Sequence, residues 1–174
     1  MCVMCYIGLK SEIKEIEFNQ DKPAFCIERM QKSDFDAKTF SSPNIYWVGS
    51  SAGCGCGFGV QRIPENIISE VRAFLKNKKK IPDKYRNYFE YEDTIEEVED
   101  TIKENKEFAE DTEKLYSLIC EQSENNDIIE FFGCWSGREK EEFDKIKQVK
   151  LSAEKLDIDF GEMWNLNVKM IIEK

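Results

Sequence analysis

Residues 44–59 read NIYWVGSSAGCGCGFG, in which an apolar run passes directly into a loop of glycine and cysteine. The run is β-branched and aromatic, follows a proline and stops at a glycine, which predicts a buried strand over residues 45–48. The run at residues 2–9 is apolar on both faces, which is typical of a strand that is covered on both sides. We expect these two strands to be central in a sheet, and residues 128–135 to form a third strand.

Two other segments have the periodicity of helices. In residues 64–75, apolar side chains recur at intervals of three and four positions, which places them on one face of a helix. The T-x-x-E pattern at residues 94–97 is a capping box and predicts the start of a second helix. The apolar stripe of this second helix continues to about Cys120 and is interrupted at Asn105 and Thr112. We expect one long helix that is packed at its two ends.

Near the end of the chain, apolar and polar residues alternate, with Trp164, Leu166, Val168 and Met170 on the apolar side. This alternation predicts a strand with one face in water. Residues 148–151 are also strand-like, and residues 25–30 fit either an edge strand or a helical turn. No linker rich in Gly, Pro or Ser divides the chain. We therefore predict one α+β domain over residues 1–174, with a mostly antiparallel sheet of four to six strands and two main helices packed largely on one face.

The charge of the chain is concentrated in one segment. The formal net charge is −10, and residues 93–130 contain fourteen acidic residues and three lysines, so the remainder is close to neutral. Phosphate binding needs a basic surface, and we therefore predict no nucleic-acid partner. The acidic helix at residues 94–120 instead suggests a basic protein partner, as for an inhibitor or immunity protein. The sequence predicts no particular oligomeric state.

The cysteines and the apolar runs indicate the compartment. No run approaches the roughly 18 apolar residues of a membrane span, and the first ten residues do not have the basic start of a secretory signal. The chain has seven cysteines, an odd number, and several lie inside apolar runs, which is typical of reduced thiols. We expect a cytoplasmic protein with no membrane partner.

The chain contains no histidine, which excludes the Cys-His and Ser-His catalytic mechanisms. No carboxylate, lysine or tyrosine is distinguished from its neighbours by its sequence context. We therefore assign no catalytic residue, and the sequence does not decide whether the protein is an enzyme.

The glycine-cysteine loop, residues 49–59, is where we expect a functional site. Cys54 and Cys56 form C-x-C, and Cys2 and Cys5 form C-x-x-C. Together with Cys134 on the third strand, these cysteines are candidate thiolate ligands for zinc, copper or iron. Residues three apart in a strand point to opposite faces, so Cys2 and Cys5 share an ion only where the first residues bend away from the strand.

Three other interpretations of the loop stay open. Anion binding fits the order strand, glycine loop, helix, but the loop matches neither the Walker pattern nor the dinucleotide fingerprint. A redox or nucleophilic thiol is the second interpretation, because nearby backbone N–H groups lower a thiol pKa. The third is a tight turn in which glycines allow close backbone approach and cysteines fill space.

Met1-Cys2 and Tyr6, residues 46–58 (YWVGSSAGCGCGF) and residues 130–135 (EFFGCW) occur in this order along the chain. This set resembles a family of small uncharacterised bacterial proteins with a Y-x-V-G-S strand, a GCGCGF loop and a later strand that ends in C-W. The family has no assigned activity, so the resemblance implies no catalytic residue. It implies that the loop and Cys134 form one cluster.

Overall fold

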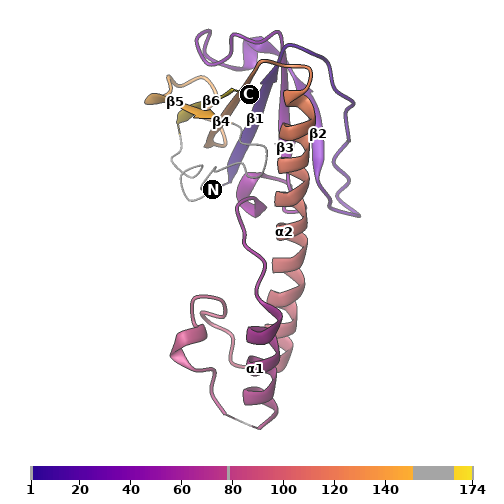
Figure 1. Ribbon diagram of the computed structural model, residues 1–174, viewed down its shortest axis with the longest axis vertical. Coiled ribbons are helices and arrows are strands. Elements are labelled where there is room, and N and C mark those ends of the chain that lie inside the picture. Colours follow the sequence, from indigo (N-terminus) through magenta and orange to yellow (C-terminus); the bar gives the residue numbers. More distant parts are fainter. Residues whose placement is uncertain (1, 78, 151–166, 174) are drawn as a thin grey trace.

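The computed structural model describes residues 2–77, 79–150 and 167–173, which form a head built on a β-sheet and a long arm (Figure 1). The strands are β1 (Val3–Leu9), β2 (Cys26–Met30), β3 (Asn44–Gly49), β4 (Ile128–Trp135), β5 (Lys145–Lys150) and β6 (Val168–Glu173). The helices are α1 (Glu65–Lys76) and α2 (Ile95–Ser123), with short 3-10 turns at Lys32–Asp34, Gly55–Gly57 and Asp83–Tyr85.

One mixed sheet contains the six described strands in the order β2-β3-β1-β4-β6-β5. All neighbours are antiparallel except β5 and β6, which are parallel. The two strands predicted to be central, β1 and β3, lie inside the sheet, and the third predicted strand, β4, lies beside β1. The predicted α+β fold with a mostly antiparallel sheet is therefore confirmed.

The main hydrophobic core lies between one face of the sheet and the C-terminal half of α2. Leu115, Leu118 and Ile119 of the helix pack with Ile7 of β1 and Phe131 of β4 in this core. Side chains alternate along a strand, so the residues between these positions point to the opposite face. Each central strand is covered on both faces, which explains its nearly continuous apolar sequence.

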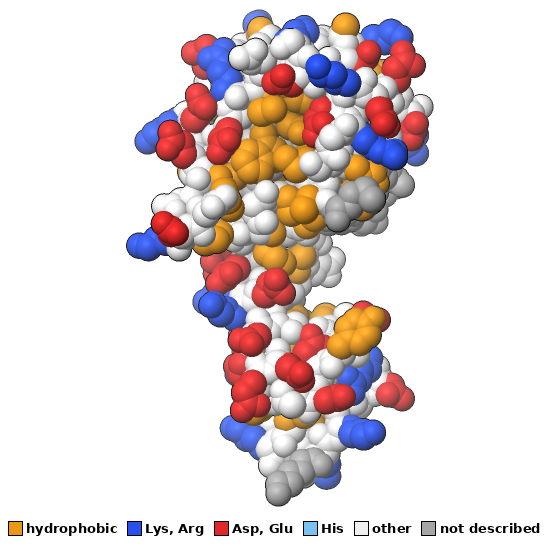
Figure 2. Space-filling view, turned by 180° about the vertical axis from the view of Figure 1, so that it is seen from behind, with side chains coloured by type: hydrophobic (Ala, Val, Ile, Leu, Met, Phe, Trp, Pro, Cys, Tyr) orange, Lys and Arg blue, Asp and Glu red, His pale blue; other side chains and the backbone are white. Residues whose placement is uncertain are grey.

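The opposite face of the sheet has a second core. Tyr6, Phe132 and Cys134 pack there with Phe35 and Phe40 from the connection between β2 and β3. Partly buried side chains border this core, namely Met4, Met30, Trp47 and Phe143. Seen from behind, the head shows a gathering of hydrophobic side chains surrounded by charged ones (Figure 2).

The arm has a third core, which lies away from the sheet. The apolar side chains predicted to share one face of the first helix lie in this core or pack against it, with Val71 fully buried; they are Ile67, Ile68, Val71, Phe74 and Leu75. α1 packs against the N-terminal half of α2, and Ile81, Tyr85 and Phe89 from the connection fill the remaining space. The helical face was correctly predicted, but α1 buries it against α2 in the arm, and of the two described helices α2 is the one that supplies residues to the core on the sheet (Figure 1).

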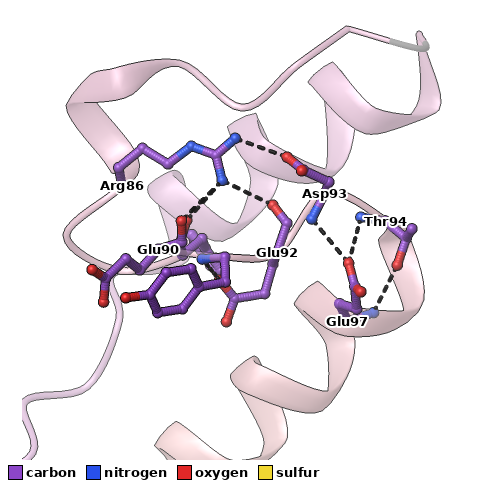
Figure 3. A network of polar contacts seen from close by, with 8 residues as sticks. Arg86, Glu90, Glu92, Asp93, Thr94 and Glu97 are labelled. Atoms are coloured by element: carbon purple, nitrogen blue, oxygen red, sulfur yellow. Dashed lines mark hydrogen bonds and ion pairs between the residues drawn. The ribbon is translucent and has the colours of Figure 1, made fainter.

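The connection into α2 is held by backbone and side-chain hydrogen bonds (Figure 3). The guanidinium of Arg86 donates to the carbonyl of Glu92 at 3.0 Å and to the carboxylate of Asp93 at 2.9 Å. The amide of Glu97 donates to Oγ1 of Thr94, and the amide of Thr94 donates to the Glu97 carboxylate. The predicted capping box is therefore confirmed, and these groups serve to begin the helix.

α2 is one helix of 29 residues, and its polar interruptions have partners. Asn105 accepts from the amide of Ile63 at 2.9 Å and donates to the carbonyl of Gln61 at 3.0 Å. Oγ1 of Thr112 accepts from the amide of Gly59 at 3.0 Å. The middle of the helix thus binds the extended connection that runs from the head to the arm.

The C-terminal strand differs from the prediction on one face. Lys169, which was expected in water, is only 6% exposed, and its ammonium lies 2.5 Å from the carboxylate of Glu130. The prediction was wrong because side chains on both faces of β6 are buried, including Lys169 on the face that was expected to be wet. The remainder of the predicted alternation, at Trp164 and Leu166, lies outside the described residues.

Glu130 is 1% exposed and accepts hydrogen bonds from Ser41 and Ser42 as well as from Lys169. Burial alone would raise its pKa, but the hydrogen bonds from Lys169, Ser42 and Ser41 outweigh burial and lower the pKa to about 2. The carboxylate therefore stays charged and fastens the connection after Phe40 to β4.

Among the described residues, no helix is both long enough and apolar enough to cross a membrane.

Candidate metal centre

The glycine-cysteine loop folds back over the start of β1 as soon as β3 ends. The carbonyl of Cys54 accepts from both the amide and the hydroxyl of Ser50, at 2.9 and 2.8 Å. Gly53 makes the reversal with a φ of +69°, a conformation that side chains rarely adopt. The turn Gly55–Gly57 follows and carries Cys56 over the N-terminal strand.

Three of the predicted sulfur ligands come together in this loop. Sγ atoms of Cys2, Cys54 and Cys56 all lie within 4.8 Å of one another. Cys2 is exposed, Cys56 is partly buried and Cys54 is buried. Metal–sulfur bonds of about 2.3 Å place the sulfurs of one ion about 3.8–4.0 Å apart, so a contraction of about 1 Å or less would complete the site.

Backbone amides orient two of the three sulfurs. The amide of Cys56 donates to Sγ of Cys54 at 3.3 Å, and the amide of Val3 donates to Sγ of Cys56 at 3.3 Å. Such bonds stabilise a thiolate when a metal has displaced its proton. The second bond also joins the loop to the first residue of β1.

Cys5 lies on the same face of the sheet but beneath the loop. A Cβ atom on Gly55 would come within 2.5 Å of Sγ of Cys5 and 3.2 Å of the carbonyl oxygen of Val3. Glycine at position 55 thus allows the loop to rest directly on β1. Cys5 is not a member of the three-sulfur group.

Cys134 lies on the other face of the sheet. In the β1–β4 register Cys134 is opposite Met4, and its side chain packs with Tyr6 and Phe35 in the second core. The loop and Cys5 belong to the first core. The structure therefore does not bring Cys134 to the loop, contrary to what the resemblance implies, because the sheet separates them.

Burial governs the ionisation of the inner thiols. It raises the pKa of Cys54 to about 12, with a smaller contribution from the neighbouring Cys56. Burial likewise raises the pKa of Cys134 to about 12 and raises the pKa of Cys5. The expectation that loop amides lower the pKa of Cys54 is wrong, because a single hydrogen bond from an amide does not offset the effect of burial. The free Cys54 thiol is thus protonated at neutral pH, and a metal ion must displace the proton.

Seven amides of the loop donate to groups of the protein itself. Those of residues 50–53 donate to Cys54, Asp111 and Ser50, and those of residues 56, 58 and 59 donate to Cys54, Gly55 and Thr112. A phosphate-binding loop directs such amides towards its ligand. The internal bonding argues against anion binding.

One residue that holds the loop was missed by sequence reasoning. Asp111 of α2 is only 2% exposed, and its carboxylate accepts from the amide of Ser51 at 2.6 Å and from Lys114 at 2.8 Å. Among many acidic residues on one helix, nothing in the sequence distinguishes Asp111. The interruption of the apolar stripe at the adjacent Thr112 was the available signal, since Thr112 also binds the loop.

No known protein family, no curated protein and no solved structure matches this chain. The chemistry of the loop must therefore be argued from its own geometry. That geometry is three cysteine sulfurs from two segments, with one exposed side at Cys2.

Proposed function

We propose that the protein binds a soft metal ion, zinc or copper(I), through Cys2, Cys54 and Cys56. The observation that supports this proposal is the approach of the three sulfurs to within 4.8 Å of one another. Thiolates select soft or borderline ions over magnesium and calcium. Iron is less suited, because an iron–sulfur cluster ordinarily takes four cysteine ligands.

The coordination would be open on one side. Copper(I) accepts three thiolates without a further ligand, whereas zinc would complete its tetrahedron with water or a ligand from outside. The exposed Cys2 gives solvent access to this position, while the buried Cys54 closes the opposite side. The ion would therefore lie at the surface of the head, close to the place where α2 contacts the loop.

Binding would join two distant parts of the chain. Cys2 precedes β1, and the other two ligands follow β3, so the ion would fasten the N-terminus to the loop. An ion that binds the folded chain and not the unfolded chain stabilises the fold. All seven cysteines are free, which supports a reducing compartment such as the cytoplasm.

Elemental analysis of untagged protein, purified under reducing conditions without added metal, tests the proposal together with anaerobic titration by Zn²⁺ and Cu⁺. We expect one ion per chain in the wild type and in Cys120→Ser and Cys134→Ser, and a loss of at least about tenfold in affinity in Cys54→Ser and Cys56→Ser. Equal uptake by all variants, or none by the wild type, contradicts metal binding. A metal-free protein whose Cys54 or Cys56 reacts rapidly with iodoacetamide at neutral pH would support redox sensing instead.

A further inference from the structure

A groove about 850 Å³ in volume lies between the C-terminal half of α2 and the chain that follows β1. Residues 11–16 form one wall, residues 110–125 of α2 and its C-terminal end form the other, and Phe25 and Ile27 of the β2 region lie between them. This volume is within the range of about 300–1,000 Å³ that holds a ligand or several side chains. None of the residues that line the groove is a cysteine.

The base of the groove is apolar. Ile16, which is 45% exposed, and the partly buried Ile13 line it above Phe25, Ile27 and Leu118, which are already buried. Large aliphatic side chains exposed in a concave surface lose contact with water when a partner covers them. The base therefore favours an apolar face on the bound group.

The rim of the groove is acidic. Its carboxylates belong to Glu12, Glu110, Glu113 and Glu121, against the ammonium groups of Lys14 and Lys114. Lys114 is already held by the buried carboxylate of Asp111 at 2.8 Å. The rim thus presents an excess of negative charge to anything that enters.

Several rim carboxylates are accessible to an incoming cation. Glu12 pairs with Arg29, Glu113 with Arg62 and Glu110 with Lys106, but all three pairs are largely exposed, and such pairs contribute only about 0–1 kcal/mol each. Within residues 2–77, 79–150 and 167–173, Glu121 forms no ion pair. A basic side chain of a partner replaces the exposed pairs at little cost.

The backbone of the first wall is already bonded. Ile16 and Ile27 exchange two amide–carbonyl hydrogen bonds of 2.8 Å, and the amide of Arg29 donates to Glu15. The edge of β2 is thereby closed at these positions, so recognition in the groove depends on side chains and not on addition of a strand.

We propose that this groove binds an amphipathic, basic helical segment of a protein partner. Its apolar residues would lie on Ile13, Ile16 and Leu118, and its lysine or arginine side chains would meet the glutamates of the rim. The inference goes beyond metal binding and does not depend on it. It places the expected basic partner at the head end of α2 and not along the arm.

Fluorescence anisotropy with a labelled 14-residue peptide tests the inference. The peptide carries leucine at helical spacing on one face and lysine elsewhere, and two matched peptides replace either all lysines by glutamate or all leucines by serine. We expect the leucine-lysine peptide to bind, and Glu121→Lys and Ile16→Asp to weaken it about tenfold, equivalent to about 1.4 kcal/mol each. The matched control Glu104→Lys makes the same charge change on an exposed arm position of α2 and should weaken binding less than about twofold.

Circular dichroism establishes that each variant is folded. The inference is overturned when the leucine-lysine peptide fails to bind, when the serine peptide binds equally well, or when Glu104→Lys weakens binding as much as Glu121→Lys. The last two results would mean that only the overall charge of the protein attracts the peptide. Cys54→Ser should bind the peptide like the wild type, which keeps this test separate from metal binding.

Discussion

The backbone amide of Val3 donates a hydrogen bond of 3.3 Å to Sγ of Cys56, although 53 positions separate the two residues. This bond places the loop on the first residue of the sheet and brings Cys56 close to Cys2. A metal ion at the three sulfurs would strengthen the same connection, because it would bind both segments at once.

Metal should therefore raise the thermal stability of the protein. At a free metal concentration of about 100 times Kd, the gain is about 2.7 kcal/mol, which corresponds to about 5–10 °C in Tm. Differential scanning calorimetry of the metal-free protein with and without Zn²⁺ measures this shift. At the same metal concentration Cys56→Ser should lower the gain by about half or more, and Cys120→Ser, which removes an exposed thiol of α2, should leave it intact. A shift of undiminished size in Cys56→Ser would place the ion elsewhere.

Gly55→Ala should destabilise the protein by about 1–3 kcal/mol, because the added Cβ meets Sγ of Cys5 at 2.5 Å. Cys5→Ala removes that sulfur, so Gly55→Ala should cost less in the Cys5→Ala background. Urea denaturation of the four proteins in this double-mutant cycle measures the coupling. An equal cost in both backgrounds would mean that the carbonyl of Val3, and not Cys5, limits position 55.

Lys169→Met should cost about 3–5 kcal/mol, because it leaves the charge of Glu130 buried without its counter-ion. Lys38→Met is the matched control: it breaks an exposed ion pair with Glu142 and should cost less than about 1 kcal/mol. Chemical denaturation at neutral pH compares the two. Similar costs would show that Glu130 is adequately stabilised by Ser41 and Ser42 alone.

The carboxylate of Glu130 also makes the stability of the protein depend on pH. The pKa of Glu130 is lowered in the folded state to about 2, from an ordinary value of 4.5, so the unfolded chain binds its proton at higher pH than the folded chain does. Its contribution is complete above about pH 4.5 and is lost as the pH falls towards 2, on the order of 3 kcal/mol in all. Glu130→Gln removes this component, so the free energy of unfolding should decline less between pH 5 and 2.5 than in the wild type. Parallel declines in the two proteins would contradict the assignment.

Thr112→Val should destabilise the junction of head and arm by about 1–3 kcal/mol, because the amide of Gly59 loses its acceptor. Hydrogen exchange at that amide should speed up by a larger factor than exchange in the centre of the sheet. Ser117→Ala removes an exposed hydroxyl that bonds to its own helix, and it should change stability by less than about 0.5 kcal/mol. Unchanged exchange at Gly59 in Thr112→Val would show that the connection is held by Asn105 instead.

Much of the fold follows from local patterns. The apolar runs of β1 and β3 predicted central strands, and the spacing in α1 predicted the face that Val71 buries. The pattern did not indicate what covers that face. The apolar face of α1 is covered by α2 and by residues of the connection after α1. These residues fill the space over that face without contacting the sheet. Lys169 is a second example of a contact that a local pattern does not predict. Alternation predicts the two faces of a strand, but it does not predict that a buried carboxylate lies against one of them.

The cysteines show which features of the site the amino-acid sequence determines and which features only the folded structure decides. Composition and order alone excluded histidine chemistry, indicated free thiols and directed attention to Cys54 and Cys56. Which other cysteine meets them depends on strand pairing and on the side of the sheet to which each side chain points. Cys2 reaches the loop because β1 begins beneath it, and Cys134 does not because its side chain points to the opposite face. Sulfurs must lie within a few ångströms to share an ion, and only the packed chain sets distances between residues that are far apart in sequence.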